Sequence, residues 1–491
     1  MTRFTTSGMQ ALFEPRGVAI AGASTHPGKF GFVALHNLLA NGYRGAVYAT
    51  QRDGAEVLGI KCQTDFASLP AGPLDLVVVC TPPGAVHDVL TQAAQRGARA
   101  AFVVTAGYQE AGAQGALRQK ELVALADSLD MALVGPNGQG VVSTPASLCA
   151  QIVAPYPPPG PISIASQSGN FVSSYMNIAS QHGVGVARAV SVGNSASIDV
   201  LDMIDYFSTD DASRVGLTYL EGIGDGATFV ERVRPITSRM PVVLVKGGRT
   251  GDGQRAATSH TGSLATDDRI FDGIARQAGL LRARSIESAY LAAASLATQP
   301  ALKGPRVAVV TTVGGWGVLA ADSVAANGLQ LAEISPALRE TLDRVLPARW
   351  SKNNPIDMAG GETRDTVPEV LAAVAADPAV DAVLFLGIGI QSNQAAAIRN
   401  GPFYPDFGTE RIVAFHERQD ERYAVTAREV ALASQKPVLV ASELANADPD
   451  NAGPRAVRAS GTVCYPSGEL ALEALGHMWT DRRWRARRGL V

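Results

Sequence analysis

The chain has 491 residues, more than a single hydrophobic core usually supports, so we expect two to four domains. Apolar residues make up 46% of the sequence and charged residues 18%, a composition that excludes an intrinsically disordered protein. Lys and Arg number 42 and Asp and Glu 45, and the formal charge of -3 argues against a nucleic-acid-binding protein that relies on bulk positive charge.

The cysteines and the first residues of the chain indicate whether the protein binds a metal, spans a membrane or is exported. The cysteines form no Cys-x-x-Cys pair, and no paired His or Cys spacing indicates a metal site. No apolar run is long enough to span a bilayer, and the start MTRFTTSGMQ lacks the apolar region of a signal peptide. We therefore expect a cytoplasmic protein with free thiols, no metal and no membrane contact. The arginine-rich stretch 482–488 is interpreted as a solvated tail.

Short β-branched apolar runs recur along the first third of the chain, each followed by a turn and a helix-like stretch. This alternation is typical of parallel sheets that helices cover on both faces. The predicted strands lie at 17–22, 46–50, 74–81, 100–107 and 131–137. We expect a doubly wound domain over residues 1–150.

Five prolines in eight residues at 154–161 exclude a helix or a central strand and predict a linker. Further strands are predicted at 161–166, 186–192, 214–222 and 241–248, and then at 306–315, 382–389, 411–416 and 436–442. The predicted fold class is α/β, with three consecutive Rossmann- or flavodoxin-like domains with parallel sheets. The second domain is expected over 160–298 and the third over 304–480.

The first strand ends in a turn of small residues, within GVAIAGASTHPGKFG at 17–31. Such a turn brings backbone N–H groups to a helix N-terminus, where phosphate binds well. The spacing is not Gly-x-Gly-x-x-Gly, and the strand at 46–50 has no carboxylate at its end to hold a ribose, which argues against NAD. A tight turn without a ligand is the alternative.

Two further strand ends lie where ligands of α/β proteins bind, TPPG at 81–84 and TAG at 105–107. SIASQSGN at 163–170 places Ser166 and Ser168 at a helix start, where hydroxyls and free N–H groups suit an anion. The alternative for these serines is a helix cap. TTVGGWG at 311–317 is either another phosphate loop or a tightly packed turn.

ATSHTGSLAT at 257–266 places His260 in a polar loop after a strand. A histidine in such a loop can act as a base, a metal ligand or a nucleophile toward phosphorus, and a surface histidine is the alternative. Glu221 ends a buried strand in YLEG. Its carboxylate can accept a ring N–H and fix a histidine tautomer, or it can be a capping or salt-bridged group.

GVAIAGAS, GPNGQG, SQSGN, YLEG, SHTGSL and TTVGG follow one another in this order. With them the chain resembles the alpha-subunit part of the acyl-CoA synthetase (NDP-forming) superfamily, in its ADP-forming acetate–CoA ligase branch. It is more distantly similar to the succinyl-CoA synthetase alpha subunit. The resemblance covers nearly the whole chain, and SHTGSL together with SQSG and YLEG is its specific part.

The resemblance implies a reaction that interconverts acyl-CoA, phosphate and ADP with a carboxylic acid, CoA and ATP. It implies that His260 is the phosphohistidine and that Glu221 orients its ring. The implied phosphate-binding residues are Ser166, Gln167, Ser168, Gly169, Asn170, Ser259, Thr261 and Gly262. The implied CoA-binding residues are Gly22, Ala23, Ser24, Arg52, Thr81, Pro82, Thr105, Ala106 and Gly107.

The family's nucleotide-binding half is an ATP-grasp module, and no segment of this chain resembles one. We therefore expect an ATP-grasp beta chain that supplies Mg and ADP or ATP, and an oligomer that also takes CoA and a small carboxylic acid. The alternatives are a CoA or acyl-CoA sensor or scaffold without the nucleotide step, and an NAD-dependent oxidoreductase.

Overall fold

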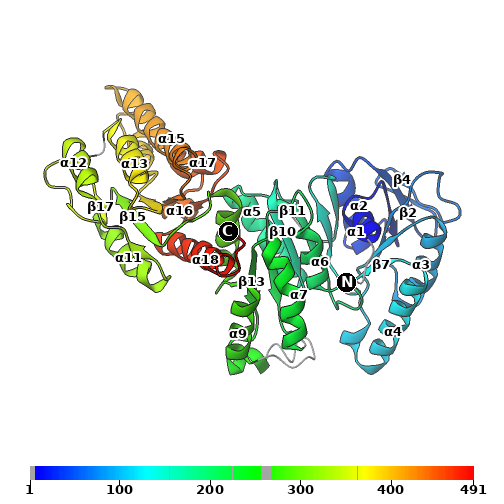
Figure 1. Cartoon of the computed structure of the whole chain (residues 1–491). Helices are drawn as coiled ribbons and strands as arrows, with labels where there is room; N and C mark the ends of the chain where they lie inside the picture. The colour runs from blue at the N-terminus through cyan, green and yellow to red at the C-terminus, as the bar shows by residue number, and fades with distance from the viewer. Residues whose placement is uncertain (1–5, 154, 224, 256–266, 362) are drawn as a thin grey trace. The chain divides into compact units, whose positions relative to one another are not determined.

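The computed structural model describes residues 6–153, 155–223, 225–255, 267–361 and 363–491 (Figure 1). The chain divides into two compact units, one of residues 1–180 and 185–286 and the other of 181–184 and 287–491. Three large sheets accompanied by helices build these units, which confirms the predicted α/β fold class. Within the described ranges, no helix is long and apolar enough to cross a membrane.

The first unit begins with a five-stranded parallel sheet in the order β2-β1-β5-β6-β7. Its strands are β1 (Gly17–Ala21), β2 (Ala46–Thr50), β5 (Leu76–Val79), β6 (Ala100–Val103) and β7 (Ala132–Val134). Its helices are α1 (Thr6–Phe13), α2 (Phe30–Ala40), α3 (Val86–Gln95) and α4 (Ala113–Ser128), with the 3-10 turns η1 (Pro83–Ala85) and η2 (Gln109–Ala111). A small hairpin, β3 (Glu56–Val57) and β4 (Ile60–Lys61), follows β2.

Helices bury both faces of this sheet. Successive strand side chains point to opposite faces, so Ile20 packs in the core that includes α1 and α2, while Ala21 packs in the core that includes α3 and α4. All five residues of β1 are buried. A ligand can therefore reach the sheet only at the ends of its strands.

A seven-stranded sheet follows in the first unit, in the order β14-β13-β12-β10-β11-β8-β9. Its strands are β8 (Gly140–Ser143), β9 (Leu148–Gln151), β10 (Pro159–Ser166), β11 (Val186–Ser191), β12 (Val215–Leu220), β13 (Val242–Lys246) and β14 (Leu281–Arg282). Its helices are α5 (Gly169–His182), α6 (Val200–Phe207), α7 (Gly226–Arg239) and α9 (Asp268–Ala278), of which α7 and α9 lie side by side (Figure 1). Among the described residues of this sheet, β8 is antiparallel to both of its neighbours, β11 and β9, and the other paired strands are parallel.

The predicted linker at 154–161 is wrong in its last residues, because β10 begins at Pro159 and lies between β12 and β11. Its register against β11 is irregular between Pro159 and Ile162. Proline has no N–H to donate to the ladder, so regular pairing starts only where the prolines end.

The second unit holds a six-stranded parallel sheet in the order β16-β15-β18-β19-β20, with β17 paired to β15. The strands are β15 (Arg306–Thr311), β16 (Gln330–Leu331), β17 (Ile356–Asp357), β18 (Ala382–Leu386), β19 (Val438–Ala441) and β20 (Cys464–Tyr465). The helices are α10 (Ile286–Thr298), α11 (Gly314–Ala326), α12 (Pro336–Val345), α13 (Thr366–Ala376), α14 (Ile390–Arg399), α15 (Thr409–Ser434), α16 (Leu444–Ala447), α17 (Ala452–Ala459) and α18 (Gly468–Ala486). The arginine-rich stretch 482–488 mostly belongs to α18, where Arg485 pairs with Asp481, and is not a tail.

The strand predicted at 411–416 is wrong, because these residues lie in the 26-residue helix α15. The buried positions along α15 include Val413, Asp420, Ala424, Ala427 and Ala431, which recur at helical spacing. The short run IVAF imitates a strand, yet only one of its four residues is buried.

A buried arginine ties α1 to the second sheet. The Arg188 side chain in β11 is 1% exposed, and its guanidinium lies 3.1 Å from Asp210 and 2.5 Å from Glu14. It also donates to Ser143 Oγ and lies over the Phe13 ring. Burial raises the pKa of Asp210, but the hydrogen bonds from Arg188 and Ser213 outweigh it and hold that pKa below its ordinary value.

Arg188→Met should lower the free energy of unfolding by about 3 kcal/mol, because it leaves the Asp210 carboxylate buried without its cation. Denaturant unfolding at neutral pH measures this loss. The pKa of Asp210 is lower in the folded protein than in the unfolded chain. The ionised Asp210 therefore stabilises the fold at neutral pH, and this stabilisation is lost as pH falls below about 4. The variant should therefore lose less stability on acidification than the parent. Arg99→Met, which breaks an exposed pair with Asp130, is the control and should cost less than about 1 kcal/mol. Equal losses in both variants would contradict this account.

Candidate active site

The glycine turn after β1 is closed by backbone hydrogen bonds and admits no side chain at its first residue. Gly22 has a φ of +85°, and a Cβ there would lie 2.9 Å from the carbonyl carbon of Cys80. The N–H groups of Gly22 and Ala23 both donate to the carbonyl of Thr50, at 3.0 Å each. A Cβ on Gly31 would overlap the Gly22 carbonyl, so α2 begins directly against the turn.

A histidine that the sequence analysis did not single out shapes the approach to α2. The backbone N–H of Gly28 donates to His26 Nδ1 at 3.0 Å, and the N–H of His26 donates to Ser24 Oγ at 3.1 Å. Lys29 immediately precedes the first residue of α2. Two basic side chains therefore flank this helix N-terminus. Arg52 lies in the turn after β2 and is exposed.

The ends of β5 and β6 complete this edge of the first sheet. Thr105 Oγ1 donates to the carbonyl of Thr81 at 2.7 Å. Thr81 Oγ1 is buried and has no hydrogen-bond partner among the described residues. Pro82 and Ala106 are exposed, and Gly107 has a φ of +99°. Nearly all the predicted CoA-binding residues thus lie at or just beyond the carboxyl ends of neighbouring strands.

The SQSG turn uses one of its hydroxyls internally. Ser166 Oγ accepts from the N–H of Ser168 at 3.0 Å and donates to the carbonyl of Ser168 at 2.7 Å. The Thr311 hydroxyl makes the same pair of bonds with Val313 before α11. The Ser166 hydroxyl is therefore engaged within the turn that precedes α5.

Glu221 lies beside this turn. It follows β12, is 6% exposed, and its backbone N–H donates to Gln167 Oε1 at 2.8 Å. Burial raises the pKa of Tyr219 to about 12, and the charge and hydrogen bonding of Glu221 add to the rise. The Tyr219 ring stacks on Phe171 of α5 with centroids 3.6 Å apart. Tyr219 and Phe171 are thus supporting residues that the sequence analysis missed, although Tyr219 belongs to the YLEG motif.

The predicted phosphohistidine segment falls outside the described residues, as do His260, Ser259, Thr261 and Gly262. The residues before and after it are described. Lys246 Nζ, at the end of β13, donates to the carbonyl of Gly247 at 3.0 Å and lies 3.8 Å from Asp268 Oδ1, at the start of α9. Burial lowers the pKa of Lys246, and Asp268 opposes that effect. The end of β13 and the start of α9 therefore meet at one buried ammonium group.

Hydrogen bonds join the edges of the first two sheets. Glu110 accepts from the N–H of Gly107 at 2.5 Å and from Asn194, in the loop after β11. Asn194 also donates to Gln119 Oε1 at 3.0 Å. Gln139, in GPNGQG, packs on the helix start at Gly169, where a Cβ would overlap the Gln139 side chain. Glu110, Asn194 and Gln139 carry no signal for this role in the sequence, because only the fold brings them to this edge.

The sequence analysis expected no metal site. Among the described residues, no group of three or more His, Cys, Asp or Glu side chains is arranged to hold an ion.

Three family models match the chain. A CoA binding domain matches residues 16–144, a succinyl-CoA ligase like flavodoxin domain matches 159–296, and a ligase-CoA domain matches 307–390. The alpha subunit of ADP-forming acetate–CoA ligase I of Pyrococcus furiosus is 35% identical over 72% of this chain and 77% of its own length. The ADP-forming 4-hydroxybutyrate–CoA ligase of Nitrosopumilus maritimus is 29% identical over 76% of this chain and 54% of its own.

The whole chain also matches a solved structure. The dinucleotide-forming acetyl-coenzyme A synthetase 1 of Ca. Korarchaeum cryptofilum, in complex with phosphate and ADP, superposes with a TM-score of 0.84 at 29% identity. The match covers 99% of this chain and 100% of that one.

These matches and the strand-end geometry define the chain as part of a CoA-dependent acid–thiol ligase. It belongs to the ADP-forming acetate–CoA ligase family, as a member of the alpha-subunit type. The resemblance predicted from the motifs is thereby confirmed, and a sensor or scaffold without ligase activity is not favoured.

Gly169→Ala should lower the free energy of unfolding by about 1–3 kcal/mol, because the added methyl group collides with Gln139. In a Gln139→Ala background the same change should cost much less, and denaturant unfolding of the four proteins gives the coupling energy. Gly273→Ala in α9 is the control, since a Cβ there has nothing within 4 Å and should be neutral or stabilising. Additive effects of the two changes would show that Gln139 does not press on Gly169.

Proposed function

We propose that this chain is the CoA-binding, phosphohistidine-bearing part of an enzyme that interconverts acyl-CoA, phosphate and ADP with a carboxylic acid, CoA and ATP. The observation that carries the proposal is the convergence of Gln167 and Glu221 at one strand edge. That edge is hydrogen-bonded to the edge with the glycine turn through Glu110 and Asn194. The names of the relatives support the same reaction class.

The residues at the edge of the first sheet suit CoA. Gly22, Ala23 and Ser24 form a turn whose first position accepts only a glycine. The turn lies against the start of α2, where the helix N-terminus stabilises a phosphate. Thr81 Oγ1 is a buried hydroxyl without a partner among the described residues, and it is free to bond the amide or hydroxyl groups of the ligand. Arg52, and Thr105 with the two residues that follow it, complete the proposed contacts.

The proposed reaction has two steps on this chain, formation of an acyl phosphate and transfer of its phosphoryl group to His260. Phosphate attacks the thioester carbonyl, the C–S bond breaks, and acyl phosphate and CoA form. A ring nitrogen of neutral His260 then attacks phosphorus, the P–O bond to the acyl oxygen breaks, and the carboxylate leaves. The other ring nitrogen keeps its proton, which Glu221 accepts in a hydrogen bond, and the carboxylate balances the positive ring.

We propose that an ATP-grasp beta chain binds ADP together with Mg. This ADP then accepts the phosphoryl group from His260 of the present chain. The Pyrococcus furiosus relative is named as a subunit alpha, and this chain spans only 54% of the Archaeoglobus fulgidus ADP-forming acetate–CoA ligase I. Gly169 and Asn170 would face the phosphoryl group through backbone N–H groups, Gln167 through its side-chain NH₂ group and Ser168 through its hydroxyl, while Ser166 closes the turn. Ser259, Thr261 and Gly262 would complete the site.

Thr81→Val should weaken CoA binding about tenfold without lowering the stability of the free protein. The hydroxyl has no partner among the described residues in the free chain, so its removal costs no internal hydrogen bond. Calorimetric titration with CoA and denaturant unfolding measure the two effects. If Thr81→Val lowered the free energy of unfolding and left CoA affinity unchanged, the Thr81 hydroxyl would be a structural group and not a CoA-binding one. NAD should not raise the melting temperature of either protein.

His260→Ala should abolish acid-labile, base-stable labelling of the chain by labelled phosphate and a panel of acyl-CoAs, and should leave CoA affinity unchanged. Glu221→Gln should slow the labelling about 100-fold, because the ring loses its orienting carboxylate. His36→Ala on α2, an exposed histidine, is the control and should label normally. A His260→Ala protein that still takes the label would remove the central residue of the proposal.

A further inference from the structure

The hydroxyl of Tyr219 lies beside the carboxylate of Glu221, at the carboxyl end of β12. The two residues are two positions apart along the strand direction, so their side chains point to the same face of the sheet. In the pairing of β12 with β13, Leu220 lies opposite Lys246, and Gly247 is therefore the next residue opposite Glu221. A Cβ on Gly247 would lie 2.7 Å from Tyr219 Oη. The bare glycine thus leaves the space that the phenol group fills next to Glu221.

The ring of Tyr219 is held in place by α5. Phe171 stacks on it, with ring centroids 3.6 Å apart and ring planes 15° apart. Tyr219 is buried, so its ring has little freedom to move. A phenol oxygen lies in the plane of its ring, and the stacking together with the contact at Gly247 therefore fixes where the hydroxyl points.

The Tyr219 hydroxyl is a donor at neutral pH. Burial, the charge of Glu221 and a hydrogen bond with Glu221 together raise the pKa of Tyr219 to about 12. The phenol therefore keeps its proton and donates in that hydrogen bond. A carboxylate accepts several hydrogen bonds, so Glu221 can also accept one from a histidine ring. Because the backbone N–H of Glu221 donates to Gln167 Oε1 at 2.8 Å, Glu221 is fixed at its backbone as well as at its carboxylate.

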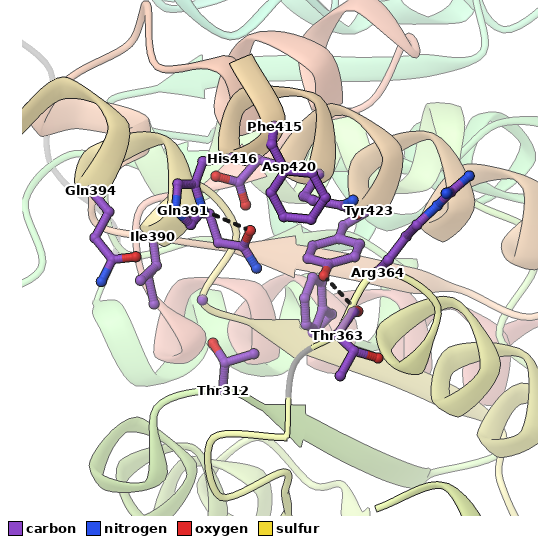
Figure 2. Close-up of a pocket in the computed structure, with 13 residues that line it drawn as sticks. Thr312, Thr363, Arg364, Ile390, Gln391, Gln394, Phe415, His416, Asp420 and Tyr423 are labelled. Carbon is purple, nitrogen blue, oxygen red and sulfur yellow. Dashed lines mark hydrogen bonds between the residues drawn. The ribbon is translucent and has the colours of Figure 1, made fainter. Parts of the chain in front are cut away.

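Tyrosines that serve the fold use their hydroxyl groups in another way. Tyr423 donates to the carbonyl of Thr363 at 3.0 Å (Figure 2), and Tyr290 donates to the carbonyl of Val184 at 2.7 Å. Each of these hydroxyls satisfies a backbone group within the second unit. Tyr219 is bonded instead to a carboxylate that the proposed reaction uses, which indicates a role in that reaction.

We propose that Tyr219 is a positioning residue for phosphoryl transfer, whose hydroxyl holds the Glu221 carboxylate in the orientation that accepts the ring N–H of the reacting histidine. A carboxylate free to rotate would spend part of its time turned away from the ring, and the nucleophile would lose its fixed orientation. Tyr219 itself touches neither the phosphoryl group nor the ring. Its role in catalysis rests on the proposed function, whereas its contact with Glu221 does not.

Phosphohistidine labelling of Tyr219→Phe tests the inference. The substitution keeps the ring that stacks on Phe171 and removes only the hydroxyl. Labelled phosphate is used with the acyl-CoA of the panel that labels the parent fastest. The maximal labelling rate should fall about tenfold, because the orienting carboxylate loses its own support. CoA affinity and the acyl-CoA concentration that gives the half-maximal rate should stay unchanged.

A double-mutant cycle separates positioning from a general structural effect. In a Glu221→Ala background, Tyr219→Phe should change the labelling rate by less than about twofold, because no carboxylate is left to orient. A hydroxyl that only stabilised the fold would slow labelling by the same factor in both backgrounds.

Tyr175→Phe is the matched control. Tyr175 lies four residues after Phe171 on α5, is fully buried, and its hydroxyl has no hydrogen-bond partner among the described residues. Its removal should leave the labelling rate unchanged. Tyr290→Phe, which loses the bond to Val184, is the control for a structural hydroxyl and should lower the melting temperature while labelling like the parent.

A second measurement reports on the contact without the reaction. In the full chain labelled with 3-fluorotyrosine, the fluorine NMR resonance that is missing from Tyr219→Phe belongs to Tyr219. The pKa of this tyrosine should be lower in Glu221→Gln than in the parent, because the neutral amide does not oppose ionisation of the phenol. Glu231→Gln, at an exposed position of α7, is the control and should leave the pKa of Tyr219 unchanged.

The possible failures are distinct. Labelling of Tyr219→Phe at the parent rate, equal slowing in both backgrounds, or a Tyr219 pKa that does not respond to Glu221→Gln would each overturn the inference. Absence of labelling in the parent would contradict the proposed function and with it the catalytic role of Tyr219, and the fluorine titration would still show whether Tyr219 and Glu221 are in contact.

Discussion

Burial of the parallel sheets on both faces is the constraint on which the site depends. Once α1 and α2 cover one face of the first sheet and α3 and α4 the other, the strand interiors are closed to any ligand. Chemistry is left with the carboxyl ends, where loops can carry polar groups without breaking the hydrophobic layers. Gly22, Thr81 and Glu221 all lie at or just beyond such ends.

The strand-to-helix turns also follow a common design. A hydroxyl at the last strand residue, Ser166 in one sheet and Thr311 in another, bonds both backbone groups of the residue two positions later. This closes the turn and aligns the start of the next helix. Phosphate recognition at such a turn then falls to backbone N–H groups, which need no charged side chain. The Gln167 side chain is left to bond the backbone of Glu221.

Local sequence patterns predicted the features that local physics decides. Continuous β-branched runs identified β1, β5, β12 and β13, because strands buried on both faces have no polar alternation. The small residues around Gly22 predicted a strand-to-helix turn, and the positive φ of Gly22 shows why its first residue is a glycine. The same reasoning failed at 411–416, where four apolar residues within a polar helix resemble a strand.

Features that depend on distant segments could not be predicted from the sequence. The contact of Gln139 with Gly169 and the bonds of Glu110 with Asn194 join residues far apart in the chain. The edge hairpin of β8 and β9 was not anticipated either, since two four-residue strands give little periodicity. His260 lies outside the described residues, and its role rests on the motif and on the proposal.

Hydrogen–deuterium exchange of the chain with and without CoA tests most directly whether the strand ends of the first unit are the binding site. The account predicts slower amide exchange at residues 22–31, 81–85 and 105–110, and unchanged exchange along α15 in the second unit. Protection confined to the second unit, or CoA binding that leaves those three segments unchanged, would contradict it.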